Sequence, residues 1–368
     1  MRRRARKKLR MIIMTSGIIL MSPFVAGILI KGMDILSAAS EKLSEITVGE
    51  EIVSTETESA GDAEKYDYFP SEGFGWIDEN IVSETDEADD GGAEPYPTQW
   101  NTGTGQVVQT TYGKYSGTQY FDLDKAGQVK NLTDIPSRDL LSQSRMRPEF
   151  KIELNSQPQV LIMHTHTTES FEPYEREFFD SSFGYRTTDS SKNMVMVGDA
   201  ITEQLENSGI ITIHDATIHD YPSYNGSYER SAETVKKILA QYPSIKVVLD
   251  IHRDAIASED SLIQPVAEID GKKASQVMII SGCDDGTMDM PNCLYNFRFA
   301  CMIQQQMESS YAGLTRPILF DYRKYNQNLT TGSLLIEVGS HGNTLEQSRY
   351  AGELIGKSVA EVLLSLKE

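Results

Sequence analysis

The pattern of apolar and polar positions changes near residue 156 of the 368-residue chain. From there to the C-terminus, short apolar runs alternate with segments in which apolar residues recur every three or four positions. Short apolar runs are typical of buried strands, and a period of about 3.6 residues is typical of amphipathic helices. Their alternation predicts an α/β fold over 156–368, with an open, mixed, mostly parallel sheet and helices on both of its faces.

The individual elements follow from these runs and from the residues that interrupt them. Predicted strands cover 160–163, 210–213, 247–251, 318–322 and 334–338, and a hairpin is predicted from 266–269 and 277–280. Predicted helices cover 194–205 and 227–241, and another begins after Pro291 and Asn292. We expect the last helix to begin at Asn343 as N-cap, because Glu346 three residues later gives a capping-box spacing.

The N-terminal part of the chain has no such alternation. Residues 11–30 contain no charged side chain and are long enough to cross a hydrocarbon core of about 30 Å, so they predict a transmembrane helix. The basic residues of 1–10 predict a cytoplasmic head. The alternative is a cleaved secretory signal with its cleavage site near 37–39. Both interpretations place the rest of the chain outside the cytoplasm.

Two further segments separate this predicted anchor from the α/β domain. Residues 31–99 are predicted to form an acidic flexible linker, because 41–94 hold 18 acidic and 2 basic side chains and no sustained apolar period. Residues 100–155 mix short alternating runs with turn residues, and they predict a small β-rich lead-in to the α/β domain at 156–368.

Charge and cysteine content narrow the range of functions. The net charge of −20 argues against a nucleic-acid-binding protein, which needs clustered Lys and Arg. The three cysteines, Cys283, Cys293 and Cys301, have no C-x-x-C spacing and indicate neither a thiolate zinc site nor a disulfide framework. We expect buried thiols, with one bridged pair as the alternative; Cys293 and Cys301 lie too far apart on one predicted helix to bridge each other.

Three polar segments lie where apolar strands are predicted to end. His166 and Glu169 follow the strand 160–163 with an H-x-x-E spacing, His252 follows 247–251, and Glu337 interrupts 334–338. Open α/β sheets place their active sites at the carboxyl ends of strands. Burying Glu337 without a partner would cost several kcal/mol, so we expect it to face a cation, a donor or solvent.

These residue types are those of a catalytic zinc site. Two imidazoles and a carboxylate bind zinc and leave a position for water, so we predict His166, Glu169 and His252 as the ligands. Glu337 is then the predicted general base, and Arg253 is predicted to stabilise the oxyanion. A further prediction is that a neighbouring carboxylate, from Asp250 or Asp254, orients a ligating imidazole.

The motifs that carry these residues closely resemble those of the stage II sporulation protein P family. They span 164–170 (His-Thr-His-Thr-Thr-Glu-Ser), 250–255 (Asp-Ile-His-Arg-Asp-Ala), 325–329 and 332–339, and the resemblance extends from about residue 100 to the end. It implies a zinc-amidase, phosphorylase/hydrolase-like fold and an N-acetylmuramoyl-L-alanine amidase, with peptide cross-links as further substrates. The expected setting is the outer side of the membrane at the sporulation septum during engulfment, with peptidoglycan as substrate and stage II sporulation proteins D and M as partners.

The resemblance also assigns roles, with one departure. It places the two ligand histidines on His166 and His252 and the catalytic glutamate on Glu337. Related zinc amidases take their carboxylate ligand from the start of the first helix, but 189–193 contains no Glu here, so Glu169 is the substitute. His164 is an alternative or supporting ligand, and we expect no role for His341 beyond a rim contact.

Two other functions fit the same residues. A zinc peptidase of carboxypeptidase type shares the H-x-x-E, His and Glu set. A non-catalytic wall-binding scaffold would explain the missing Glu at the start of the first helix.

Overall fold

The computed structural model describes residues 105–180, 183, 185–258 and 260–367. The predicted cytoplasmic head, transmembrane helix and acidic linker therefore lie outside the described residues. Within the described ranges, no helix combines the length and the apolar composition that crossing a membrane requires.

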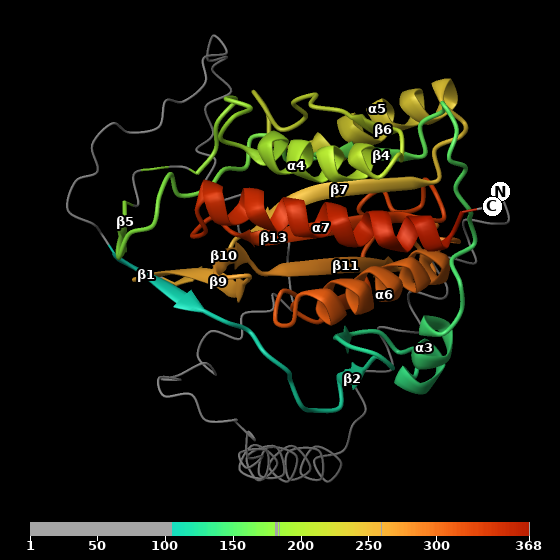
Figure 1. Ribbon diagram of the computed structural model, residues 1–368, viewed down its shortest axis with the longest axis horizontal. Coiled ribbons are helices and arrows are strands. Elements are labelled where there is room, and N and C mark those ends of the chain that lie inside the picture. The colour runs from blue at the N-terminus through green and yellow to red at the C-terminus, as the bar shows by residue number, and fades with distance from the viewer. Residues whose placement is uncertain (1–104, 181–182, 184, 259, 368) are drawn as a thin grey trace, which may run out of the picture. The chain divides into compact units, whose positions relative to one another are not determined.

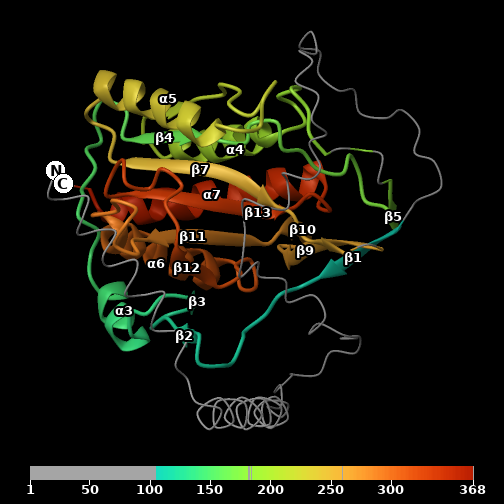
Figure 2. The ribbon, with the colours of Figure 1, turned by 180° about the vertical axis from the view of Figure 1, so that it is seen from behind.

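The described residues contain an eight-stranded mixed sheet (Figures 1 and 2). Its neighbouring strands pair in parallel except for β2 with β3 and β11 with β13, so the sheet is mostly parallel, as predicted. Every residue of β4, β7, β11 and β13 is buried, which is expected for strands covered on both faces. In sheet order the strands are β2 (Tyr120–Asp122), β3 (Gln128–Asn131), β12 (Ile318–Tyr322), β11 (Val277–Cys283), β13 (Ser333–Ser340), β7 (Val247–Asp254), β4 (Val160–Met163) and β6 (Thr212–His214).

Helices cover both faces of this sheet, as the pattern predicted. Helices α4 (Met194–Asn207), α6 (Cys293–Ser310) and α7 (Leu345–Ser365) lie on one face, and α5 (Ser227–Gln241) lies on the other (Figures 1 and 2). The alternation along β4 explains this arrangement: Ile162 joins the large core under α4, α6 and α7, whereas Leu161 joins a smaller core under α5. The short helix α3 (Ser137–Ser144) adds Leu140 to the large core.

A second sheet was not predicted. It consists of β10 (Lys272–Ser275), β9 (Ser261–Ile269), β1 (Gly105–Thr110) and β5 (Phe178–Phe179), with β8 (Ala257–Ser258) paired to β9. The predicted hairpin was wrong in its second strand, because 277–280 belongs to β11 and pairs with β13 in the main sheet. The partner of 266–269 is β10, joined through Asp270 and Gly271, both with positive φ. An Asp-Gly pair is the usual signal for such a tight turn.

The segment predicted as a β-rich lead-in contains β1, β2, β3 and α3, and its strands join the sheets of the rest of the chain. Strand β3 pairs with β12, and β1 pairs with β9. The last helix is capped one residue later than predicted: Thr344 is the N-cap and Gln347 completes the capping box. Asn343 instead accepts a hydrogen bond from the backbone N–H of Ser340.

Gly339 is the residue that allows β13 to bend directly after Glu337. Its φ is +65°, and a Cβ placed there would lie 2.4 Å from Oδ1 of Asn343. Gly271 also has a positive φ, +74°, but a Cβ there would meet nothing within 4 Å.

This pair of glycines gives a matched test. Gly271→Ala should lower the free energy of unfolding by about 1–2 kcal/mol, the cost of a left-handed backbone with a side chain. Gly339→Ala should lower it by about 1–3 kcal/mol more, because overpacking adds to the same backbone strain. Urea unfolding of both variants measures the difference; equal losses would show that Gly339 matters only for its backbone conformation.

Candidate active site

The carboxyl ends of three parallel strands bring His166, His252 and Glu337 together. Strand β7 lies between β4 and β13, and the register places His252 directly beside Glu337. His166 follows β4 by three residues, and its ring centroid lies 5.2 Å from that of His252. All three side chains are buried.

Glu169 reaches the same place through a tight turn. Its backbone N–H donates to the carbonyl of His166 at 3.1 Å, which closes the H-x-x-E segment into one turn. Its Oε2 accepts a hydrogen bond from the backbone N–H of Arg253 at 3.1 Å and lies 3.8 Å from Nδ1 of His252. Burial raises the pKa of Glu169 despite the neighbouring positive charges, of which Arg253 is the strongest.

His166 is enclosed by aromatic side chains. Its ring stacks on Tyr224 with centroids 4.6 Å apart, and the Tyr224 hydroxyl lies 3.2 Å from Nε2. Tyr228 meets the ring edge-on at 5.4 Å. Burial, with the positive charge of His252 as the next contribution, lowers the pKa of His166 well below 6.5. The imidazole is therefore neutral at physiological pH, which is the form that binds metals.

His252 lies against Asp250, which comes two residues earlier on the same face of β7. Its Nε2 lies 2.8 Å from Oδ1 of Asp250, which leaves Nδ1 on the side of Glu169. Burial opposes the imidazolium, but the charge and the hydrogen-bonding contact of Asp250, together with the negative charges of Glu169 and Glu337, outweigh it and raise the pKa of His252 to about 9. Thr165 donates to Asp250 from its backbone N–H at 2.8 Å and from its hydroxyl at 2.6 Å, which fixes that carboxylate.

Glu337 is buried, and one of its two carboxyl oxygens lacks a hydrogen-bond partner in the described part of the chain. Among the described residues, no hydrogen-bond partner reaches its Oε2. Burial, and then the negative charge of Asp254, raises the pKa of Glu337 to about 8. A carboxyl group in this state exchanges its proton near neutral pH, which a general base must do.

Asp254 and Arg253 have tasks other than those predicted. Asp254 forms an ion pair with Arg316 at 2.9 Å, whereas Asp250 is the carboxylate that lies 2.8 Å from the ring of His252. Arg253 donates from Nε to the carbonyl of Ser170 at 3.1 Å, and its other two nitrogens donate to the carbonyls of Tyr185 at 3.1 Å and Asp254 at 3.4 Å. This geometry does not support the predicted oxyanion role of Arg253, because its guanidinium holds backbone segments in place.

The sequence reasoning missed Arg186 and Tyr224. Arg186 pairs with Asp220 at 2.8 Å, approaches Glu169 at 3.8 Å, and lies over the Tyr224 ring at 4.9 Å. Its side chain is 27% exposed, so this cation has contact with solvent beside the buried histidines. Both residues lie in irregular segments, where neither a strand end nor a helical period marks them.

His164 and His341 stay apart from the pair of predicted ligands. The two ring nitrogens of His164 lie 2.9 Å from the carbonyl of Ile251 and 2.9 Å from Nε2 of His214, so its ring faces away from His166. His341 is partly exposed and meets the ring of Tyr185 edge-on at 5.2 Å.

Comparison with known proteins decides the family. A family model described as stage II sporulation protein P matches residues 50–360. This chain belongs to that family. The matched range begins earlier than the resemblance read from the motifs, inside the predicted acidic linker.

Single relatives show weaker likeness. Stage II sporulation protein P of Bacillus subtilis (strain 168) is 28% identical over 243 residues, which cover 63% of this chain and 58% of that relative. The N-acetylmuramoyl-L-alanine amidase AmiC2 of Nostoc punctiforme aligns with 57% of this chain and 98% of its own at 13% identity and a TM-score of 0.34. The CwlD amidase of Clostridioides difficile, solved with the GerS lipoprotein, aligns with 56% and 99% at 12% identity and a TM-score of 0.35. Such low structural scores support no inference about activity.

The chemistry of the donors at the strand ends fits a zinc ion. Two imidazoles and a carboxylate are a common catalytic zinc set, and Glu337 offers a buried oxygen without a hydrogen-bond partner beside them. Within the described residues, however, no three His, Cys, Asp or Glu side chains are already arranged as a metal-binding group. The Tyr224 hydroxyl lies 3.2 Å from Nε2 of His166, so this nitrogen would have to part from the hydroxyl before it could bind a metal.

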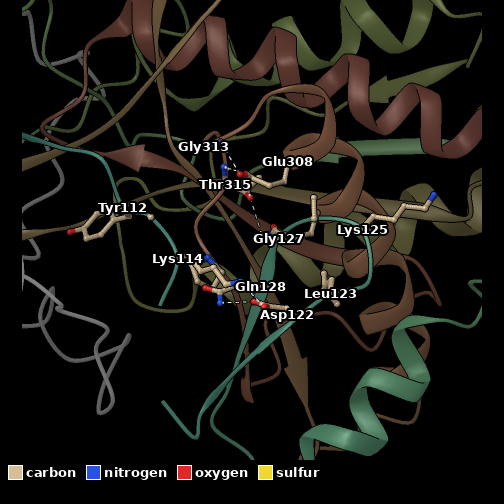
Figure 3. A pocket seen from close by; sticks show the side chains of 14 residues that line it. Tyr112, Lys114, Asp122, Leu123, Lys125, Gly127, Gln128, Glu308, Gly313 and Thr315 are labelled. Atoms are coloured by element: carbon tan, nitrogen blue, oxygen red, sulfur yellow. Dashed lines mark hydrogen bonds and ion pairs between the residues drawn. The ribbon is translucent and has the colours of Figure 1, made fainter. Parts of the chain in front are cut away.

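A hollow of about 330 Å³ elsewhere in the described structure contains none of the predicted site residues (Figure 3). Three of the charged side chains that line it have partners within the hollow: Lys114, Asp122 and Glu308. Lys114 pairs with Asp122 at 2.6 Å, and Glu308 accepts from the backbone N–H groups of Gly313 at 2.7 Å and Thr315 at 3.1 Å.

The raised pKa of Glu337 gives a prediction about stability in metal-free protein. Folding raises this pKa from 4.5 to about 8, so the stabilising contribution of the neutral carboxyl is complete below pH 4.5 and is lost as the pH rises through 8. Glu337→Gln has no such loss. Its free energy of unfolding relative to wild type should therefore rise between these pH values, by on the order of 3 kcal/mol.

Urea unfolding in the presence of a chelator measures this difference. The matched control is Glu175→Gln, because the hydrogen bond from Lys273 lowers the pKa of Glu175, so this variant should lose stability relative to wild type above pH 4.5. A Glu337→Gln variant whose difference from wild type does not change with pH would contradict the raised pKa.

Proposed function

We propose that this chain is a zinc-dependent peptidoglycan hydrolase that cleaves the amide between N-acetylmuramic acid and L-alanine. The observation that carries the proposal is the meeting of His166, Glu169 and His252 beside the buried Glu337 at one edge of the sheet. Membership of the stage II sporulation protein P family supports peptidoglycan as the substrate.

His166, Glu169 and His252 would hold the zinc ion. When bound, zinc lowers the pKa of a water molecule to about 7 and polarises the carbonyl that the water attacks. Asp250 keeps the ring of His252 oriented with Nδ1 toward Glu169. Arg253 keeps Glu169 in place through its backbone N–H and through the carbonyl of Ser170.

Glu337 carries the proton transfers. Its carboxylate takes a proton from the attacking water and passes it to the nitrogen of the departing L-alanine, which would otherwise leave as an unstable amide anion. Burial makes this carboxyl a stronger base than a carboxyl in water, which favours its role as the proton acceptor.

The proposed setting follows from the family and from the N-terminal sequence. The predicted helix 11–30 anchors the chain in the cell membrane with the catalytic domain on the extracytoplasmic side, and the acidic segment 31–99 serves as a flexible tether. The protein would degrade septal wall during spore engulfment, together with stage II sporulation proteins D and M.

One other activity has a specific observation in its favour. The H-x-x-E turn of His166 and Glu169 is also the ligand pair of zinc carboxypeptidases, so cleavage of peptide cross-links is the second candidate. The scaffold hypothesis rested on the missing Glu at the start of the first helix. Glu169 argues against it, because this carboxylate lies near His252 and would replace the missing one.

Two isosteric variants separate ligand from base. Glu337→Gln should retain about one zinc per chain and lose at least about 10²-fold in activity, because it removes only the general base. Glu169→Gln should bind zinc more weakly and lose activity with it. The exposed Glu175→Gln is the control and should match wild type in both measurements.

Metal analysis and release of peptides from purified cell wall give the two readouts. Mass analysis identifies the bond: the proposed activity frees the amino group of L-alanine, whereas a peptidase leaves it attached to muramic acid. Intact wall after incubation with zinc-loaded wild type, or a His252→Ala variant with full activity, would overturn the proposal.

A further inference from the structure

Two of the three cysteines meet at a junction outside the proposed zinc site. Cys283 is the last residue of β11, and Cys293 is the first residue of α6. Their sulfur atoms lie 3.6 Å apart, and both thiols are free. Cys301 is fully buried in α6.

The two thiols have different surroundings. Cys283 is buried, whereas Cys293 is partly exposed and lies at the N-terminus of α6, where backbone N–H groups favour a thiolate. A hydrogen bond from Cys283 and nearby backbone N–H groups outweigh burial and lower the pKa of Cys293 to about 6, and the same contact raises the pKa of Cys283. The pair thus combines a partly exposed thiol, whose pKa is lowered, with a buried neighbour whose pKa is raised.

We propose that Cys283 and Cys293 form a disulfide bond that joins the end of β11 to the start of α6. The oxidant is a disulfide, either a small molecule or an exported thiol–disulfide oxidoreductase. The Cys293 thiolate attacks one of its sulfurs, forms a mixed disulfide and releases the first thiol. Cys283 then gives up its proton and attacks the Cys293 sulfur, which releases the second thiol. Two cysteine thiols are oxidised and one disulfide is reduced to two thiols.

The bond would fasten a segment that supports the active site. Gln327 lies between the two joined elements: its Oε1 accepts from the backbone N–H of Gly282 at 2.9 Å, and its carbonyl accepts from Asn296 of α6 at 2.6 Å. Two residues earlier, Tyr325 stacks on Tyr228 with centroids 5.3 Å apart.

Tyr228 in turn lies parallel to the ring of His252, with centroids 6.4 Å apart. A bond at the junction therefore restricts the opening of 323–330, the segment that backs this face of the site. The proposal does not depend on the zinc site or on hydrolase activity. If the domain is exported, as we propose above, the oxidising environment outside the cytoplasm would favour the Cys283–Cys293 disulfide.

Oxidation of the purified full chain by oxidised glutathione, followed by thiol alkylation and tryptic digestion, tests the bond. Residues 274–298 form one tryptic peptide that contains both cysteines, and Cys301 lies on the next. The first peptide should lose two hydrogen atoms and resist alkylation until a reductant is added. Cys301 should stay reduced.

Variants give the matched controls. Cys301→Ser should form the same bond as wild type, and Cys283→Ser should form none. Oxidation should raise Tm by about 5 °C in wild type and Cys301→Ser, because the bond closes a loop of about ten residues. It should leave Cys283→Ser unchanged.

Hydrogen exchange tests the consequence for the active site. Backbone amides of 323–330 should exchange about tenfold more slowly in the oxidised wild type than in the reduced one, and those of α4 should not change. Three results would overturn the proposal: two alkylated thiols after oxidation, a lasting glutathione adduct on Cys293, or equal exchange of 323–330 in both states.

Discussion

The register between β7 and β13 is the constraint on which the site depends. It places His252 beside Glu337 at the end of two parallel strands that are buried along their whole length. If either strand slipped by one residue, its own side chain, His252 or Glu337, would turn to the opposite face of the sheet from the other. The apolar residue before each of them opposes that slip. Ile251 and Ile336 belong to the large core, and the one on the slipped strand would have to leave it. The same packing that stabilises the sheet therefore fixes the distance between His252 and Glu337.

The two buried histidines of the site have pKa values that are shifted in opposite directions. His166 and His252 have rings 5.2 Å apart, but only His252 has a carboxylate at hydrogen-bonding distance. The pKa of His252 is therefore raised and that of His166 is lowered. Two positive imidazoles so close together would repel each other, and Asp250 determines which ring carries the charge. A bound zinc ion would displace the proton of His252. Its positive charge would then take the place of the imidazolium beside Asp250, Glu169 and Glu337.

The sequence predicted the sheet, most helices and the convergence of His166, His252 and Glu337, because these depend on local apolar patterns and on the common edge of parallel strands. It failed where structure depends on distant pairing. The second sheet joins β1 to β9 across more than a hundred residues, and no local pattern indicates that partner. The sequence did contain a signal for the correct hairpin between β9 and β10, since Asp270 and Gly271 mark its turn. The tasks of Arg253 and Arg186 depend on loops whose path a one-dimensional pattern does not contain.

Arg253 shows how a buried charge acts on a site without touching a substrate. Its guanidinium donates to the carbonyls of Ser170 and Tyr185, on the two segments that also pair through Glu169 and Arg186. Its own backbone N–H donates to Glu169. Together these three contacts restrain the carboxylate of Glu169, one directly and two through the neighbouring backbone. Glu169 needs this restraint because it lies on a turn after β4. His252 and Arg253 thus place the proposed zinc ligand and the residue that positions Glu169 next to each other on the same strand.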